Sequence, residues 1–209
     1  MTTSQRMDAI EMAQHRRRPL PETAQTAAYL DMMQQVHRFQ EALVAANPEE
    51  DQAKRIGAKL AELTELLEAQ AVAEHERFYA RGEMGGSLNQ ALLPPLMVDE
   101  MTDDRLHGYC VPGLFAMGLN QAMHGGIIAA LFDVSMGRLA AGLEQRICRT
   151  AYLNTQYRNI APIGQRLDVR VWTESVEGRK RFLRAELFHG ATLCAEADAL
   201  FVEVRAGHQ

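Results

Sequence analysis

The chain has few of the features that mark membrane, secreted or nucleic-acid-binding proteins. No apolar run approaches the roughly 20 residues of a membrane span, and the N-terminal residues contain no apolar stretch of a secretory signal. A net charge of −5 gives a nucleic-acid partner no general electrostatic support. The three cysteines are widely spaced and form no Cys-x-x-Cys pair, which argues against a disulfide framework and fits a reducing compartment. We therefore expect a soluble cytoplasmic protein without a nucleic-acid or membrane partner.

Three common hydrolase centres are also missing from the sequence. No Gly-x-Ser-x-Gly motif is present, since Ser135 follows Asp133 without the flanking glycines. None of the seven histidines has a partner at a zinc-ligand spacing, so we expect neither a metal nor another cofactor. Cys148 and Cys194 lie in strand patterns, where a buried structural cysteine is more common than a nucleophile. An enzyme with this sequence needs a different kind of centre.

The first part of the chain, residues 1–82, has the periodicity of a helical arm. Apolar residues recur at helical spacing in two stripes, which are Tyr29, Leu30, Met33, Val36, Phe39 and Leu43 in the first and Ile56, Leu60, Leu63 and Leu67 in the second. Between them, Asn47-Pro48 predicts a cap and a first-turn proline for the second helix. We expect an antiparallel hairpin of two helices. Its apolar stripes need burial on the downstream domain or on a partner subunit, where the arm could border a binding site or only strengthen an oligomer.

The rest of the chain changes from helical to strand periodicity. Residues 83–103 carry glycines, small polar residues and a proline pair, and predict a connecting segment. Residues 104–209 predict a second domain, with a short strand at 107–111, a helix from Gly125 to about Leu143 and four further strands separated by glycine-containing turns. One long helix followed by an antiparallel meander predicts an α+β fold in which the sheet wraps the helix.

The strongest functional signal is the sequence His124-Gly125-Gly126 at the start of the long helix, with Asp133 two turns further on. Glycines at a helix start let a ligand approach the backbone, and the free N–H groups of the first turn attract a developing negative charge. Asp133 lies among apolar residues, where a carboxylate is uncommon. The pattern indicates an acyl-transfer site. The alternative is a Gly-Gly loop before an ordinary helix whose Asp133 faces water.

The strand after the helix adds one hydroxyl group, that of Thr150. In this strand Ala151, Leu153, Thr155 and Tyr157 alternate with Tyr152, Asn154, Gln156 and Arg158. By this alternation Thr150 lies on the polar face, with Tyr152. Such a position suits a subunit interface, and a solvent-facing threonine has the same parity.

Three stretches in this order carry a family resemblance. They are HGGIIAALFDVSMG at 124–137, RTAYLNTQYRNIAPIG at 149–164 and VEGRKRFLRAELFHGATLCAEADALFVEV at 176–204. The order resembles the hotdog fold, and more narrowly the acyl-CoA thioesterases of the PaaI-like and thioesterase-superfamily-member groups. The resemblance implies a double hotdog, as a homodimer or a dimer of dimers, with acyl-CoA as the substrate and each active site shared between two subunits.

The resemblance also implies a role for each residue of the signal. Gly125 and Gly126 match the glycines whose backbone N–H groups polarise the thioester carbonyl, and His124 matches the histidine that shapes this oxyanion hole. Asp133 matches the acid, supplied by the opposite subunit, that acts as general base or as nucleophile. Thr150 matches the hydroxyl residue that assists the acid or the attacking water. Some relatives have an asparagine six residues before the histidine, where this chain has a glycine.

Coenzyme A carries phosphates, so basic residues are expected beside the site. Arg158-Asn159 ends one predicted strand, and Arg179 and Lys180 lie in a predicted hairpin turn. With the resemblance, these four residues are candidates for substrate binding. Without it, solvated turn charges are the simpler explanation.

Two functions of different classes remain open. The favoured one is an acyl-CoA thioesterase that releases free CoA and a carboxylic acid, with CoA as part of the substrate rather than a cofactor. The alternative is a non-catalytic acyl-CoA-binding or assembly protein of the same fold. Asp133 favours the enzyme, because a pure binding protein needs no acid in an apolar helix.

Overall fold

The computed structural model describes residues 21–73, 76–79, 91–144 and 146–204. Residues 1–20 of the predicted arm and 80–90, at its end and in the predicted connecting segment, lie outside these ranges. The described residues form three α-helices and a six-stranded antiparallel sheet. The predicted α+β hotdog architecture, with two helices before it, is confirmed.

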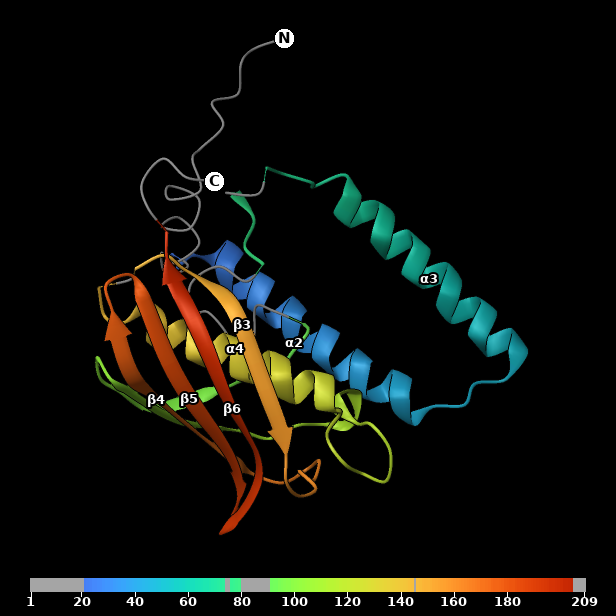
Figure 1. The fold of residues 1–209 in the computed structure, drawn as a ribbon. Helices are drawn as coiled ribbons and strands as arrows, with labels where there is room; N and C mark the ends of the chain where they lie inside the picture. The colour runs from blue at the N-terminus through green and yellow to red at the C-terminus, as the bar shows by residue number, and fades with distance from the viewer. Residues whose placement is uncertain (1–20, 74–75, 80–90, 145, 205–209) are drawn as a thin grey trace, which may run out of the picture.

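One sheet contains all six strands, in the order β1-β2-β4-β5-β6-β3. Their bounds are Met97–Met101 (β1), Arg105–Cys110 (β2), Cys148–Tyr157 (β3), Leu167–Glu177 (β4), Lys180–His189 (β5) and Thr192–Glu203 (β6). The sheet curves around helix α4, Gly125–Ala141 (Figure 1). Within the described chain, β1 and β3 are the edges of the sheet.

The core lies between α4 and the concave face of the sheet. Leu131, Phe132 and Met136 of α4 are fully buried. The sheet contributes alternate residues of its central strands, which are Leu167, Val169 and Val171 of β4, Leu183, Ala185 and Leu187 of β5, and Ala195, Ala197, Ala199 and Phe201 of β6. These are the apolar sets that alternation predicts, because one face of each strand packs on the helix.

The predicted elements of this domain differ from the observed ones mainly at their ends. The helix stops at Ala141, where Gly142 with a φ of 62° ends it, rather than near Leu143. The short strand spans Arg105–Cys110 instead of 107–111. Strand β1 was not predicted and lies in the segment expected to be a connection, where it pairs with β2. Its burial does not alternate, so it lacks the pattern that identifies a half-buried strand.

Two helices precede the sheet, α2 at Ala24–Ala45 and α3 at Glu50–Glu68. Helix α2 is capped by Thr23, whose side chain accepts a hydrogen bond from the Thr26 N–H, and it packs on the short 3₁₀ helix η2, Leu114–Ala116. The chain turns back after α2, so α3 runs in the opposite direction beyond it (Figure 1). The predicted cap of α3 is wrong, because Asn47-Pro48 lies before the N-cap, Glu49, which makes no side-chain cap bond.

Helix α3 buries no residue in the single chain. Its predicted apolar stripe of Ile56, Leu60, Leu63 and Leu67 is between 39% and 59% exposed. The arm therefore reaches the hotdog domain through α2, while the burial expected for the second stripe is not observed within the described part of the chain. No helix in that part is long and apolar enough to cross a lipid bilayer.

A matched pair of substitutions tests this division between a buried and an exposed helix. Leu131 of α4 is 0% exposed and Leu67 of α3 is 59% exposed. Leu131→Ala should lower the free energy of unfolding by about 2–5 kcal/mol, because it leaves a cavity in the core. Leu67→Ala should change it by no more than about 0.5 kcal/mol. Urea denaturation measures both. An equal loss in the two variants would show that α3 is covered in the folded protein.

Candidate functional site

A hydrogen bond joins the two candidate groups on α4 and β3. The Thr150 hydroxyl donates to a carboxylate oxygen of Asp133, with 2.8 Å between Oγ1 and Oδ1. Asp133 is half-buried, and it follows Phe132, which is fully buried in the core. The structure thus brings together an acid and a hydroxyl that are 17 positions apart in the sequence.

The position of Thr150 depends on a bulge at Ala151. In the pairing of β3 with β6, Thr150 lies opposite Phe201 and Tyr152 lies opposite Leu200, which leaves Ala151 as an extra residue. Directly paired residues project from the same face of a sheet, and Phe201 is buried against α4. Thr150 therefore faces α4. The predicted polar-face position of Thr150 is wrong, because a bulge reverses the alternation along a strand.

The three residues at the start of α4 form the second part of the site. His124 is the N-cap, and its ring Nδ1 accepts a hydrogen bond from the Gly126 N–H at 3.0 Å. The N–H of Gly126 is therefore bound to the histidine in this structure. Among the described residues, the N–H of Gly125 makes no hydrogen bond. Gly125 offers the available donor at this helix end, where the dipole favours a negative charge.

Tyr157 contacts the start of α4, which the sequence pattern does not predict. Its hydroxyl donates to the Gly125 carbonyl oxygen at 2.8 Å. A Cβ at Gly125 would lie 3.2 Å from the tyrosine ring, so a side chain at this position requires the ring to shift by a few tenths of an ångström. Tyr157 pairs with buried Ala195, which places it on the same face as Thr150. The alternation of the strand gives this face, but the contact with Gly125 has no sequence signal.

The loop before His124 is held in a fixed shape by backbone hydrogen bonds. The His124 N–H donates to the Ala116 carbonyl of η2 at 2.8 Å, and the Gly118 N–H donates to the Ala122 carbonyl at 2.7 Å. Between them, Asn120 and Gln121 have φ values of 54° and 58°, a conformation that non-glycine residues rarely adopt. Gly118 stands where some relatives have an asparagine, and a Cβ there would lie 3.3 Å from the His124 Cα.

The two parts of the site lie at different positions along α4. Gly125 and Asp133 are eight residues apart, which at a helical rise of 1.5 Å per residue separates them by about 12 Å. The strand repeats this separation, because Thr150 lies beside Asp133 and Tyr157 lies beside Gly125. A single reacting carbonyl cannot contact both ends within one chain.

The predicted phosphate-binding residues are divided in the same way. Arg158 follows β3 near Tyr157, whereas Lys180 pairs with Val202 at the other end of β6. At about 3.3 Å per strand residue, the two ends are roughly 25 Å apart. Arg158 forms an ion pair with Glu196 at 2.6 Å, and the Asn159 side chain donates to the Leu193 carbonyl.

The other predicted basic pair lies at the exposed hairpin between β4 and β5. Arg179 donates to the Glu203 carbonyl oxygen at 2.9 Å, and Lys180 is exposed beside it. This end of the sheet is the one that carries Thr150, since Thr150 and Lys180 pair with neighbouring residues of β6. The acid end of the site thus has Arg179 and Lys180 nearby, and the glycine end has Arg158 and Asn159.

Two of the three cysteines are buried and poorly suited to act as nucleophiles. Burial raises the pKa of the Cys110 thiol to about 12 and also raises the pKa of Cys194. Cys148 donates to the Ala140 carbonyl at 3.4 Å. Cys110 and Cys194 therefore remain protonated near neutral pH, and the thiolate is the reactive form. No group of three metal-binding side chains occurs in the described ranges.

Residues 120–196 match the family model of the thioesterase superfamily. The predicted family resemblance is confirmed over this segment. It begins four residues before His124 and includes both ends of the candidate site.

Curated relatives and a solved structure agree with this match. The acyl-coenzyme A thioesterase THEM4 of Mus musculus is 33% identical over 94 residues, which are 44% of this chain and 40% of that protein. THEM4 of Rattus norvegicus is 32% identical over the same length. The chain thus spans about 40% of the length of these relatives. The crystal structure of a thioesterase superfamily protein has a TM-score of 0.73 and 24% identity, covering 88% of this chain and 97% of that one. The likeness in fold therefore extends beyond the family match into the N-terminal arm.

Proposed function

We propose that the protein hydrolyses an acyl-CoA thioester to free CoA and a carboxylic acid. The observation that carries the proposal is the half-buried Asp133 carboxylate on α4, which accepts a 2.8 Å hydrogen bond from Thr150 of β3. The same helix α4 begins with the free N–H of Gly125. Thioester hydrolysis needs an activated oxygen and a donor for the tetrahedral oxyanion. The names of the curated relatives support an acyl-CoA substrate.

In the proposed reaction, Asp133 acts as general base on a water molecule. The carboxylate takes a proton from the water, whose oxygen attacks the thioester carbonyl carbon. The carbonyl electron pair moves to oxygen, and the resulting oxyanion is stabilised by the Gly125 N–H. When this pair returns, the carbon–sulfur bond breaks and the CoA thiolate takes the proton from Asp133. Direct attack by the carboxylate, followed by hydrolysis of the mixed anhydride, is the second route open to Asp133.

Two neighbours position the oxyanion donor in this proposal. Tyr157 holds the Gly125 carbonyl from one side, which fixes the orientation of the first helical residues. His124 holds the Gly126 N–H, so this amide becomes a second donor only when the histidine ring turns away or shares the bond. Gly125 is therefore the primary donor, and His124 shapes the hole rather than contacting the thioester first.

The proposal requires two subunits for each site. Strand β3 is a ten-residue sheet edge, and such an edge pairs readily with a second chain. A two-fold axis makes the two β3 strands antiparallel, which brings the Asp133 end of one chain to the Gly125 end of its partner. The same operation brings Arg179 and Lys180 of one chain toward the end of the partner that carries Arg158 and Asn159, as expected for a site that binds the phosphates of CoA.

Replacement of the acid tests the proposed function. Asp133→Asn keeps the size of the side chain and removes the proton acceptor, so kcat on the best acyl-CoA should fall by about a hundredfold or more. Thiol release measures the rate. Asp198→Asn is the matched control, because Asp198 is also half-buried and accepts a hydrogen bond, from Asn154, on a different part of the sheet. Near-normal kcat in Asp133→Asn would favour a non-catalytic binding protein.

A second pair of variants tests the oxyanion donor. Gly125→Pro removes the N–H at the first helical position, where proline is tolerated, and His124 with φ −64° and ψ 131° suits a residue before proline. Gly125→Ala keeps the N–H and meets the Tyr157 ring in the same way. The proline variant should have a kcat about a hundredfold to a thousandfold below that of the alanine variant. Equal kcat values would remove Gly125 from the oxyanion hole.

A further inference from the structure

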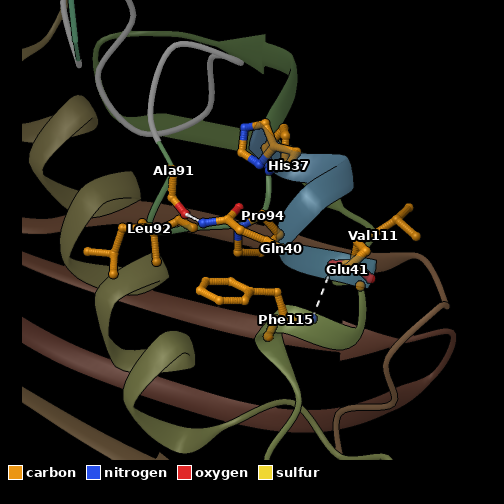
Figure 2. A pocket seen from close by; sticks show the side chains of 12 residues that line it. His37, Gln40, Glu41, Ala91, Leu92, Pro94, Val111 and Phe115 are labelled. Atoms are coloured by element: carbon orange, nitrogen blue, oxygen red, sulfur yellow. Dashed lines mark hydrogen bonds between the residues drawn. The ribbon is translucent and has the colours of Figure 1, made fainter. Parts of the chain in front are cut away.

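Helix α2 lines one side of a half-open cavity of about 250 Å³ against the hotdog domain. One wall consists of His37, Gln40 and Glu41 of α2, and the other consists of residues 91–95 together with the segment 111–116 (Figure 2). None of the predicted site residues lines it. The cavity lies at the contact between the N-terminal arm and η2, so it exists only because the arm is docked there.

Two polar side chains of α2 are already bound to the backbone of the domain. The Glu41 carboxylate accepts hydrogen bonds from the Leu114 N–H at 2.5 Å and the Phe115 N–H at 3.1 Å. The Gln40 amide donates to the Ala91 carbonyl at 2.9 Å. A Cβ at Gly113 would overlap the Glu41 carboxylate, so a side chain at this position would displace that carboxylate from its two amide donors. These groups dock the arm and are not directed at a guest molecule.

The remaining wall offers apolar side chains to an occupant. Leu93 is buried, whereas Leu92 is 63% and Phe115 is 39% exposed at the cavity. Figure 2 shows Leu92 and the Phe115 ring on the same side of Gln40. Covering such exposed apolar surface is favourable, at about 25 cal/mol per Å². Apart from the His37 side chain on the α2 wall, the lining therefore suits an apolar group rather than a charged one.

One hydrogen bond connects the cavity with the start of α4. Ala116 lines the cavity, and its carbonyl accepts from the His124 N–H at 2.8 Å. A molecule whose carbonyl lies at the Gly125 N–H is thus next to the segment that forms the cavity wall. The space is larger than the apolar cavity of about 150 Å³ that holds a benzene molecule, so it has room for an aryl ring or an alkyl chain.

We propose that this cavity binds the apolar acyl group of the substrate, and that α2 thereby sets the acyl selectivity of the enzyme. The proposal rests on the thioesterase function proposed above and names its substrate class: CoA thioesters with an alkyl or aryl acyl group. It gives the N-terminal arm a role that the family match at residues 120–196 does not include.

Narrowing the cavity in the full-length protein tests the proposal. Leu92→Trp should lower kcat/KM for dodecanoyl-CoA by about tenfold and change that for acetyl-CoA by less than about twofold, because a few methylene groups in an apolar pocket discriminate to this degree. Leu66→Trp is the matched control, since Leu66 is 66% exposed on α3, away from the cavity. The same acyl-length profile in Leu92→Trp, Leu66→Trp and the unmodified protein would overturn the proposal.

A binding measurement separates this proposal from the proposed function. S-dodecyl-CoA and S-ethyl-CoA are thioethers that cannot be hydrolysed, and calorimetry gives their affinities without turnover. If Leu92→Trp weakens the binding of S-dodecyl-CoA but not that of S-ethyl-CoA, the cavity is supported as the acyl-binding site. This holds even if the protein hydrolyses no acyl-CoA, and then only the proposed thioesterase function fails. If Leu92→Trp does not fold, Phe115→Ala should weaken S-dodecyl-CoA relative to Phe39→Ala, whose side chain is 37% exposed on α2 and does not line the cavity. If neither Leu92→Trp nor Phe115→Ala changes the affinity for S-dodecyl-CoA, the proposed acyl-binding role of the cavity is refuted.

Discussion

The spacing of Gly125 and Asp133 along α4 is the constraint on which the account of this protein depends. A straight helix holds them about 12 Å apart, whereas reacting groups must approach to about 3–3.5 Å. The core of α4 is buried against the sheet, so the helix cannot bend to bring its two ends together. Either the two groups serve different purposes, or they act in pairs across two chains. In the second case, one substrate contacts the Gly125 N–H of one chain and the Asp133 carboxylate of the other.

The edge of the sheet follows the same division. Strand β3 runs along α4, with Thr150 at Asp133 and Tyr157 at Gly125, so the strand supports both parts of the site. Because β3 is also an open sheet edge, the surface that would carry the second chain is the surface that holds the candidate catalytic groups. Assembly and activity would then depend on the same strand. The arm contacts this arrangement through η2. Glu41 of the arm accepts hydrogen bonds from two backbone amides of η2, and the Ala116 carbonyl of η2 accepts one from the His124 N–H.

The sequence was sufficient for the elements with strong periodicity. The alternation in β4, β5 and β6 predicted their buried residues, and the His-Gly-Gly pattern predicted the start of α4. Thr150 was predicted as a partner of Asp133 by resemblance, but its face was assigned wrongly because a bulge at Ala151 leaves no mark in the alternation. The hydrogen bond from the Gly126 N–H to His124 depends on the rotamer of the histidine side chain, which the spacing of residues in the sequence does not predict. Strand β1 is not predicted because its residues show no alternation of burial. The cap of α3 is misplaced because Asn47-Pro48 has the composition of a cap but lies before the true N-cap.

The most direct test of the shared site is to mix two inactive variants, Asp133→Asn and Gly125→Pro. In a dimer of the two, one site receives both intact groups and the other receives neither. With full subunit exchange at equal amounts, about a quarter of all sites should be restored, because half of the dimers are mixed and each has one intact site. Differently tagged chains allow mass spectrometry to measure the mixed dimer. Recovery of thiol release in proportion to the mixed dimer is the predicted result. Mixed dimers that form without any recovery of activity would contradict the account and place each site within one chain.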